Sequence, residues 1–225
     1  MNHFIDGGNL PVLKVFLEAG EQIQCEAGAM AWMDEGIEMQ TTAGGIGQML
    51  GRMFTNENAF MNTYVARQRG EIAFASKVPG SIKALQVVPG HGVIVQKGAY
   101  LASFGNLTNE VYLQKRLSTG FFGGEGFLMR KLTGNGIVFL EIDGSAHEYD
   151  LPVGGSKIID TGYLAAMSES CSMEIRSISG IKNMLFGGEG FFNTVARGPG
   201  KIILQSMPIN SMAGILAKYL PQSSR

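Results

Sequence analysis

Two glutamates stand in the same unusual setting. Glu125 and Glu189 each lie among glycines inside an identical string, Phe-Gly-Gly-Glu-Gly-Phe, that recurs after 64 residues (186 − 122). Glu57 lies nearby in an earlier, divergent copy of this stretch. A carboxylate in this setting could have either of two roles. In the first it accepts hydrogen bonds from backbone N–H groups of a neighbouring module. In the second it lines a polar pocket. The three glutamates are therefore candidates for inter-module contacts or for ligand binding.

Neither a metal centre nor a nucleophilic active site is predicted. A cupin-type metal site needs several histidines and a carboxylate on one barrel, whereas this chain has only His3, His91 and His147. No Gly-x-Ser-x-Gly nucleophile elbow occurs. No helical pattern follows the Gly-Gly-Glu-Gly string, as a phosphate-binding loop would require. We therefore expect no catalytic residue, no metal and no cofactor, and we expect the chain not to be an enzyme.

The phenylalanines around these strings form a second group of candidates. If the strings lie at one end of the fold, their apolar side chains gather into an interaction surface for self-association, a protein partner or a peripheral membrane contact. The other reading is that the rings fold inward and close the ends of the sheets. The candidate surface residues are Phe54, Phe121, Phe122, Phe127, Phe186 and Phe191.

Composition and charge narrow the class of protein. With 225 residues the chain is long enough to bury a core without disulfide or metal staples, and its 18 basic and 19 acidic residues give a formal charge of −1. That balance disfavours nucleic acid as a partner. The 32 glycines stand at recurring positions, which indicates many turns between short strands and an all-β fold. With no visible secretory signal and no run of ~18 apolar residues, we expect a cytoplasmic protein.

The two cysteines are predicted to be buried and inert. When the copies are aligned, Cys25 stands where the other copies have Val95 and Ile159. Cys171 likewise stands where they have aliphatic residues. Positions that accept aliphatic side chains favour a buried thiol over a reactive one.

Internal repetition predicts the architecture. The marker Gly98-Ala99-Tyr100-Leu101-Ala102 returns 64 residues later from Gly162 (162 − 98) and 70 residues earlier from Gly28 (98 − 28). Modules of this size do not easily close a core alone. We therefore expect one compact unit of three tandem β-sandwich modules, packed as a pseudo-threefold prism. The expected units are 9–78 (divergent), 79–143, 144–208 and a helical tail, 209–225.

Each module is expected to follow the same order of elements. Two strands joined by a Gly or Pro-Gly corner precede the marker, and further extended stretches follow it. A β-hairpin then closes each module, with turns at 68–70, 134–136 and 198–200, because these turns carry the Gly and Asn that positive φ favours. In the tail, the apolar spacing from Met212 to Leu220 predicts a short helix capped by Ser211.

The repeated Gly-Gly-Glu-Gly-Phe with its preceding Gly-Tyr/Ala-Leu-Ala marker resembles the altered-inheritance-of-mitochondria twenty-four family, including its bacterial branch of unknown function. The resemblance runs from about Phe4 to about Ile209. It implies a fold like the trp RNA-binding attenuation protein, a double-layered β structure repeated three times, and no established enzymatic activity. The attenuation protein's tryptophan and RNA sites do not carry over, since no matching basic motif is present.

Three functional hypotheses follow from these patterns. The first is a non-enzymatic binding or scaffold protein that forms a homo-oligomer, or docks a protein partner, through the glycine and phenylalanine strings. The alternative is a small-ligand-binding protein or degenerate enzyme with a pocket near Glu125 and Glu189. The third is a peripheral membrane adaptor. The sequence identifies neither a ligand nor a partner.

Overall fold

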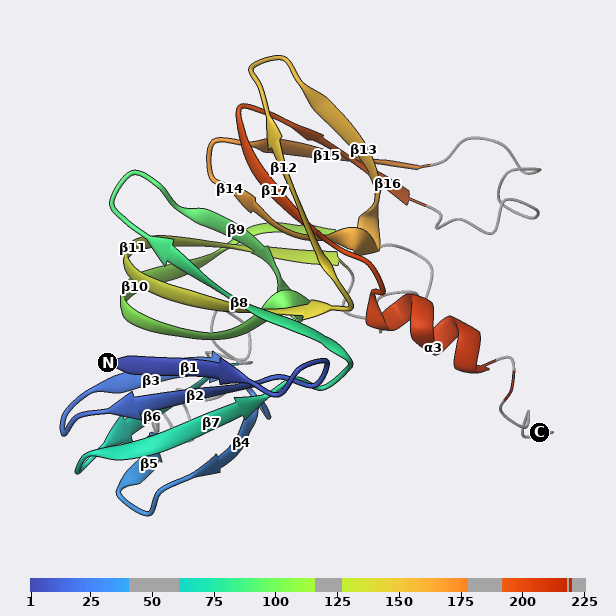
Figure 1. The fold of residues 1–225 in the computed structure, drawn as a ribbon. Coiled ribbons are helices and arrows are strands. Elements are labelled where there is room, and N and C mark those ends of the chain that lie inside the picture. The colour runs from blue at the N-terminus through green and yellow to red at the C-terminus, as the bar shows by residue number, and fades with distance from the viewer. Residues whose placement is uncertain (41–60, 116–126, 178–191, 218, 220–225) are drawn as a thin grey trace, which may run out of the picture.

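The computed structural model describes residues 1–40, 61–115, 127–177, 192–217 and 219. In these residues the chain forms β-strands in three hydrogen-bonded sheets and one short C-terminal helix (Figure 1), so the all-β prediction is confirmed. The elements are β1 (Asn2–Asp6), β2 (Val12–Leu17), β3 (Gln22–Glu26), β4 (Met30–Met33), β5 (Ile37–Gln40), β6 (Met61–Ala66), β7 (Gly70–Ala75), β8 (Gly80–Val87), β9 (Val93–Gln96), β10 (Tyr100–Lys115), β11 (Phe127–Asp143), β12 (Ala146–Leu151), β13 (Ser156–Asp160), β14 (Leu164–Ser168), β15 (Ser172–Ser177), β16 (Phe192–Arg197), β17 (Gly200–Gln205) and α3 (Ile209–Ala217).

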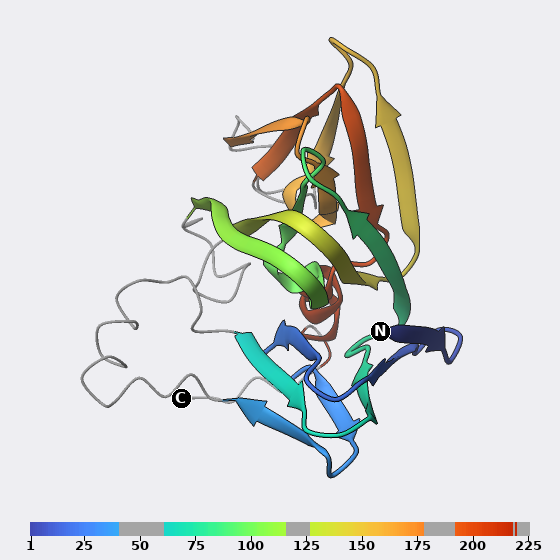
Figure 2. The same ribbon diagram turned by 90° about the vertical axis from the view of Figure 1, so that its left-hand side faces the viewer.

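The strands are stacked in three tiers, seen one above another in Figure 1 and again after a quarter turn in Figure 2. The lower tier holds β1 to β7, the middle tier β8 to β11, and the upper tier β12 to β17. In the lower tier β2, β7 and β4 form one layer, and β3, β6 and β5 form the other. In the upper tier β12, β17 and β14 pair in the same way, as do β13, β16 and β15. The middle tier makes the same pairings with two long strands, β10 and β11.

Neighbouring tiers are joined by strand pairing in one recurring register. β10 of the middle tier pairs with β3 of the lower tier, with Ala102 opposite Cys25. β14 of the upper tier pairs with β9 of the middle tier, with Ala166 opposite Val95. The two pairs are equivalent by the repeat spacing, since 166 − 102 is 64 and 95 − 25 is 70. The sheet is therefore continuous from tier to tier.

The predicted closing hairpins are wrong. β6 pairs with β3 and β5, whereas β7 pairs with β2 and β4, so the chain crosses from one layer to the other between them. β16 and β17 are divided between two sheets in the same way. In the middle tier both expected arms are halves of the single strand β11. Alternating hydrophobicity places a strand against a core, but it does not say which strand is its partner.

Gly134 lies where β11 passes from one layer of the middle tier to the other. Its φ is +119°, in the region that favours glycine. A Cβ at this position would lie 2.3 Å from the backbone oxygen of Asn106 on β10. The glycine thus lets β11 bend from one layer to the other while it stays paired with β10.

Three apolar clusters fill the spaces between the layers. In β2 the alternation is strict: Leu13, Val15 and Leu17 are fully buried, and the residues between them are half-buried. Each cluster belongs mainly to one tier, although residues of the middle tier pack into all three. Both cysteines are buried and free, as the sequence predicted. Burial, with a smaller contribution from Glu26, raises the pKa of the Cys25 thiol to about 12, which keeps it protonated and unreactive.

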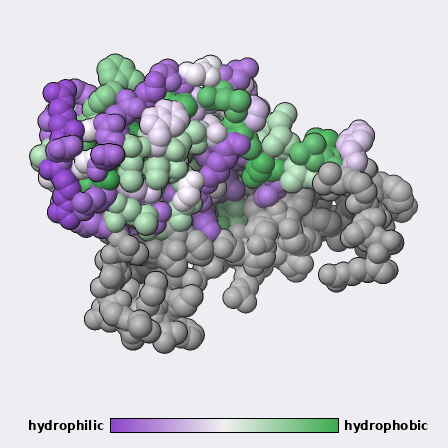
Figure 3. All heavy atoms as spheres, turned by 90° about the horizontal axis from the view of Figure 1, so that it is seen from below, coloured by the Kyte–Doolittle hydropathy of each residue, from purple (hydrophilic) through white to green (hydrophobic). Residues whose placement is uncertain are grey.

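The C-terminal helix α3 begins two residues before the predicted cap. Asp143, not Ser211, holds its first turn, because the backbone N–H of Ile209 donates to Oδ2 of Asp143 at 2.7 Å. The helix contains no charged residue between 209 and 217, and it exposes Ile215 and Leu216. Seen from below, hydrophobic side chains extend along this projecting end of the described surface (Figure 3). Within the part of the chain that is described, no helix has the length and hydropathy needed to cross a membrane.

Glu148 on β12 forms two ion pairs, and the one with Lys83 joins the upper tier to the middle tier. Its carboxylate lies 2.6 Å from Nζ of Lys83 on β8 and 2.9 Å from Nζ of Lys201 on β17. The hydrogen bonds from Lys201 and Lys83 lower the pKa of Glu148 to about 2. The three side chains are about a third to nearly a half exposed, so solvent screens the pairs.

We expect Glu148→Gln to lower the free energy of unfolding by about 1 kcal/mol at pH 7. A carboxyl whose pKa is depressed in the folded state stabilises the protein above its unfolded-state pKa, near 4.5, and that contribution is lost as pH falls toward 2. Urea unfolding of both proteins between pH 7 and pH 2 measures the difference. A gap between the two proteins that stays constant down to pH 2 would contradict the assigned ion pairs.

Candidate functional site

Most of the residues that the sequence singled out lie outside the described residues. Phe54 and Glu57 fall within 41–60, and Phe121, Phe122 and Glu125 fall within 116–126. Phe186, Glu189 and Phe191 fall within 178–191. The inter-module and ligand roles proposed for the three glutamates therefore stay predictions.

Phe127 is described, and its assignment to an exposed interaction surface is wrong within this chain. It is the first residue of β11 and only 1 % exposed. Its ring belongs to a buried cluster that includes Ile94, Met129 and Leu151. The apolar ring gains more from this burial than from contact with water. The inward-folding reading therefore holds for this phenylalanine.

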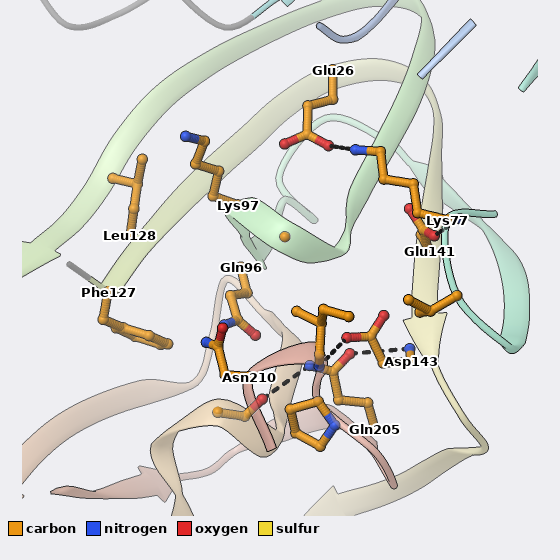
Figure 4. Close-up of a pocket in the computed structure, with 15 residues that line it drawn as sticks. Glu26, Lys77, Gln96, Lys97, Phe127, Leu128, Glu141, Asp143, Gln205 and Asn210 are labelled. Carbon is orange, nitrogen blue, oxygen red and sulfur yellow. Dashed lines mark hydrogen bonds and ion pairs between the residues drawn. The ribbon is translucent and has the colours of Figure 1, made fainter. Parts of the chain in front are cut away.

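A polar pocket of about 290 Å³ lies where the three tiers meet the start of α3 (Figure 4). The lower tier contributes Glu26 at the end of β3, and Lys77 follows β7. The middle tier contributes Gln96 and Lys97 before the marker glycine, together with the C-terminal end of β11. The upper tier and α3 complete the wall. The lining residues are Glu26, Lys77, Val78, Gln96, Lys97, Gly98, Phe127, Leu128, Glu141, Asp143, Gly162, Gln205, Pro208, Ile209 and Asn210.

Glu141 fastens the segment that links the lower and middle tiers. It lies on β11 and is only 3 % exposed. Its Oε1 accepts a short hydrogen bond from the backbone N–H of Lys77. The Ser76 hydroxyl also lies 2.9 Å from this oxygen, and it has the carbonyl oxygen of Val78 as a second acceptor at 2.8 Å. A buried carboxylate must have such donors, because an unpaired buried charge is strongly disfavoured.

Gln205 on β17 fastens the next link in the same way. Its Oε1 accepts from the backbone N–H of Asp143 at 3.3 Å, and its Nε2 donates to the carbonyl oxygen of Gly162 at 2.9 Å. The repeat spacing relates Gln205 to Glu141 (205 − 141 is 64). One wall of the pocket is therefore built from equivalent clamps between successive tiers.

The electrostatics of the pocket are set by three carboxylates and two ammonium groups. Lys77 donates to Glu26 at 2.7 Å. Burial lowers the pKa of Lys77, but the hydrogen bond and charge of Glu26, with the charge of Glu141, outweigh it and leave the pKa raised. Burial raises the pKa of the Asp143 carboxyl despite its bond from Ile209. Counting Glu26, Glu141 and Asp143 against Lys77 and Lys97, the formal charge of the lining is −1 (2 − 3).

Gln96 supplies an acceptor that the protein leaves unused. Its Oε1 is buried and has no hydrogen-bond partner among the residues that the structure describes. Among the described residues, no three His, Cys, Asp or Glu side chains are arranged to hold a metal ion. The pocket is therefore suited chemically to a ligand that donates hydrogen bonds.

Sequence reasoning missed this site, although two signals pointed toward it. Charged residues interrupt the apolar end of β11 at Glu141 and Asp143, where only a buried polar contact explains them. The marker glycines Gly98 and Gly162 line the same pocket. The repeat thus marked residues around the site, but the sequence alone did not show that successive tiers bring them together.

Comparison with known proteins identifies the family. The model of the family described as "Mitochondrial biogenesis AIM24" matches residues 3–207. An uncharacterized protein of Streptococcus pyogenes serotype M6 is 30 % identical over 223 residues, covering 95 % of this chain and 88 % of that protein. A Streptococcus pyogenes protein solved by X-ray crystallography superimposes with a TM-score of 0.82 at 27 % identity, covering 97 % of this chain and 99 % of the other. The chain, with its three stacked tiers and tier-to-tier clamps, therefore belongs to the AIM24 family.

Proposed function

We propose that this protein is a non-enzymatic scaffold that assembles head to tail, with strand β13 of one copy pairing with strand β4 of the next. The observation that carries the proposal is a pair of open sheet edges. Among the described residues β4 pairs only with β7, and β13 pairs only with β16. The equivalent strands inside the chain are paired on both sides, through β3 with β10 and β9 with β14.

The recurring register specifies which residues would meet. Shifting the inner pairs by the repeat spacings places Trp32 (102 − 70) opposite Ile159 (95 + 64) of another copy. It places Met33 (103 − 70) opposite Ile158 (94 + 64). All four side chains are apolar, as an antiparallel pair buried between two tiers requires.

Two of these side chains are more exposed than their equivalents on strands that pair across tiers, as expected at an unpaired sheet edge. Ile158 is 69 % exposed, whereas the equivalent Ile94 is 1 % exposed beneath the next tier. Met33 is 36 % exposed, whereas the equivalent Met167 is 1 % exposed. Proteins usually protect sheet edges with charges, proline or a covering segment. An edge with exposed apolar side chains is instead suited to receiving another strand.

The shape of β4 also matches that of the strands joined inside the chain. A register irregularity lies between Met30 and Trp32 in β4, and the same irregularity recurs between Tyr100 and Ala102 and between Leu164 and Ala166. β4 therefore has the local bend that its equivalents have when they pair across tiers.

One hydrogen bond between the middle and upper tiers predicts an equivalent hydrogen bond between neighbouring copies. The backbone N–H of Gly92 donates to Oε2 of Glu169 at 2.9 Å where the middle and upper tiers join. By the repeat spacing, Glu35 (169 − 134) would accept from Ser156 (92 + 64) of the next copy. Glu35 is exposed and therefore accessible for this contact.

This assembly changes how the expected threefold prism would close. Within one chain the described strands form an open stack, so we propose that neighbouring copies, rather than β4 and β13 of the same chain, complete the three-module arrangement. Such a heterologous contact gives a ring if the rotation closes and a filament if it does not. The contact rests on sheet edges, whereas the sequence placed it at the phenylalanine strings.

Sedimentation velocity across protein concentration tests the proposal. The wild type is expected to form a species larger than the monomer, and Ile158→Lys is expected to shift it to monomer because a buried lysine would disrupt the paired edge. Val153→Lys is the matched control, because Val153 is 84 % exposed in the same tier but lies off the edge strand.

Trp32 provides a second readout in the same samples. It is the only tryptophan in the chain and is 46 % exposed, so its fluorescence should shift to shorter wavelength when the edge is covered. A wild type that stays monomeric at every concentration would overturn the proposal. Equal association of the Ile158→Lys and Val153→Lys variants would also overturn it.

A further inference from the structure

We infer that the pocket between the three tiers and α3 is a binding site for a small organic ammonium ion with a short apolar body. The inference goes beyond the proposed assembly and does not depend on it, because one chain provides all the lining residues. Its volume of about 290 Å³ is near the lower end of the range for small-molecule sites, about 300–1,000 Å³.

The hydrogen-bonding capacity of the pocket favours a donor. Gln96 Oε1 is buried and has no hydrogen-bond partner within the described part of the chain. Asp143 and Glu141 accept the contacts already described, but a carboxylate has room for about four hydrogen bonds in all. An ammonium group has three donors and no acceptor, so it complements these oxygens.

The charge of the pocket favours a cation over a neutral donor. Three carboxylates and two ammonium groups line it, and Lys77 is already paired with Glu26. Glu141 and Asp143 are 3 % and 7 % exposed, so water contributes little to the stabilisation of their charges. A cation beside them would restore that stabilisation and favour the ionised carboxyl of Asp143, whose pKa is raised by burial.

Two accessible apolar side chains also line the pocket. Leu128, beside the buried Phe127, lies at the start of β11, and Ile209 lies beside Asp143 at the start of α3. Figure 4 shows the Phe127 ring on the opposite side of the view from Asp143. A ligand that spans the pocket therefore needs a charged end and a hydrocarbon end.

Three six-carbon probes of different charge test the inference: n-hexylammonium, 1-hexanol and hexanoate. Binding is measured by calorimetry and by saturation-transfer NMR on the Ile158→Lys variant, so that assembly does not enter the result. We expect n-hexylammonium to bind at least about tenfold more tightly than 1-hexanol, and hexanoate not to bind. Equal affinity for the ammonium ion and the alcohol, or no binding of the ammonium ion, would overturn the inference.

Variants of the chain locate the bound charge. Asp143→Asn keeps an oxygen that can accept from the Ile209 N–H and removes only the charge, so we expect α3 to remain and the affinity for n-hexylammonium to fall at least about tenfold. Asp150→Asn makes the same change in net charge on a side chain that is 84 % exposed, and we expect no loss. Gln96→Met, which removes the unpaired acceptor, is a second variant should Asp143→Asn not fold. Unchanged affinity in whichever variant folds would contradict the assigned site.

Discussion

A chain carrying Met33→Cys and Ile158→Cys is expected to form covalent multimers under mild oxidation. The recurring register places these two positions opposite each other in neighbouring copies. Directly opposed residues of antiparallel strands have Cα atoms about 4.5–5.5 Å apart, within the range that a disulfide spans. The native Cys25 and Cys171 are buried, so they should not contribute. Non-reducing electrophoresis should show a ladder that collapses on reduction.

The ladder also reports how the assembly ends. β4 and β13 belong to opposite tiers of one chain (Figure 1), so a bond between them joins different copies. A ladder that ends at one defined largest multimer indicates a closed ring, and a ladder with no largest multimer indicates a filament. The control is Met33→Cys with Val153→Cys, which retains one edge cysteine and moves the other off the edge strand. Equal ladders from the two proteins, or a single unlinked band from the first, would contradict the predicted register.

The second large effect is expected from Glu141→Ala, which should lower the free energy of unfolding by about 2 kcal/mol. The substitution leaves the part-buried backbone N–H of Lys77 without its acceptor, and an unsatisfied donor of this kind costs about 1–3 kcal/mol. The Ser76 hydroxyl keeps the carbonyl oxygen of Val78 as an acceptor at 2.8 Å. Urea unfolding, followed by circular dichroism in the Ile158→Lys background, measures the change without a contribution from association.

Two control variants distinguish the loss of the hydrogen-bond acceptor at position 141 from the loss of a negative charge. Glu141→Gln keeps an acceptor at the same place and is expected to cost about 1 kcal/mol. Glu38→Ala removes an exposed carboxylate that pairs with Arg67 at 2.9 Å, and it is expected to cost about 0.5 kcal/mol or less. A loss for Glu141→Ala no greater than that for Glu141→Gln would show that the Lys77 N–H finds another partner and would contradict the assigned clamp.

The sequence predicted many of the strands because the repeat and the alternating hydrophobicity agree. Two strands were expected before each marker glycine, and β2 with β3 before Gly28 and β12 with β13 before Gly162 agree with this. The short helix in the tail was also expected, although its start was not. A contact with the distant Asp143 determines that start, and no local capping residue reports it. The N-terminal strand β1 was missed, because it has no counterpart in the repeat.

Strand partners and the pocket were harder to predict, because they depend on contacts between distant residues. Gly134 carries the glycine signature of a hairpin turn, yet it bends one continuous strand between two layers. Glu26 and Gln96 each stand two residues before a marker glycine, and nothing in the sequence pairs them with each other. Only the stacking of tiers brings them to one cavity with Glu141, which is far from both in sequence.

The two long strands of the middle tier give it a property that the outer tiers lack. β10 and β11 each run through both layers and stay paired along nearly their whole length. In the outer tiers the layers are made of separate short strands, so one layer can detach while the other persists. The middle tier has no such seam. It should therefore open as a single cooperative unit, and its amide hydrogens should be the slowest to exchange with solvent.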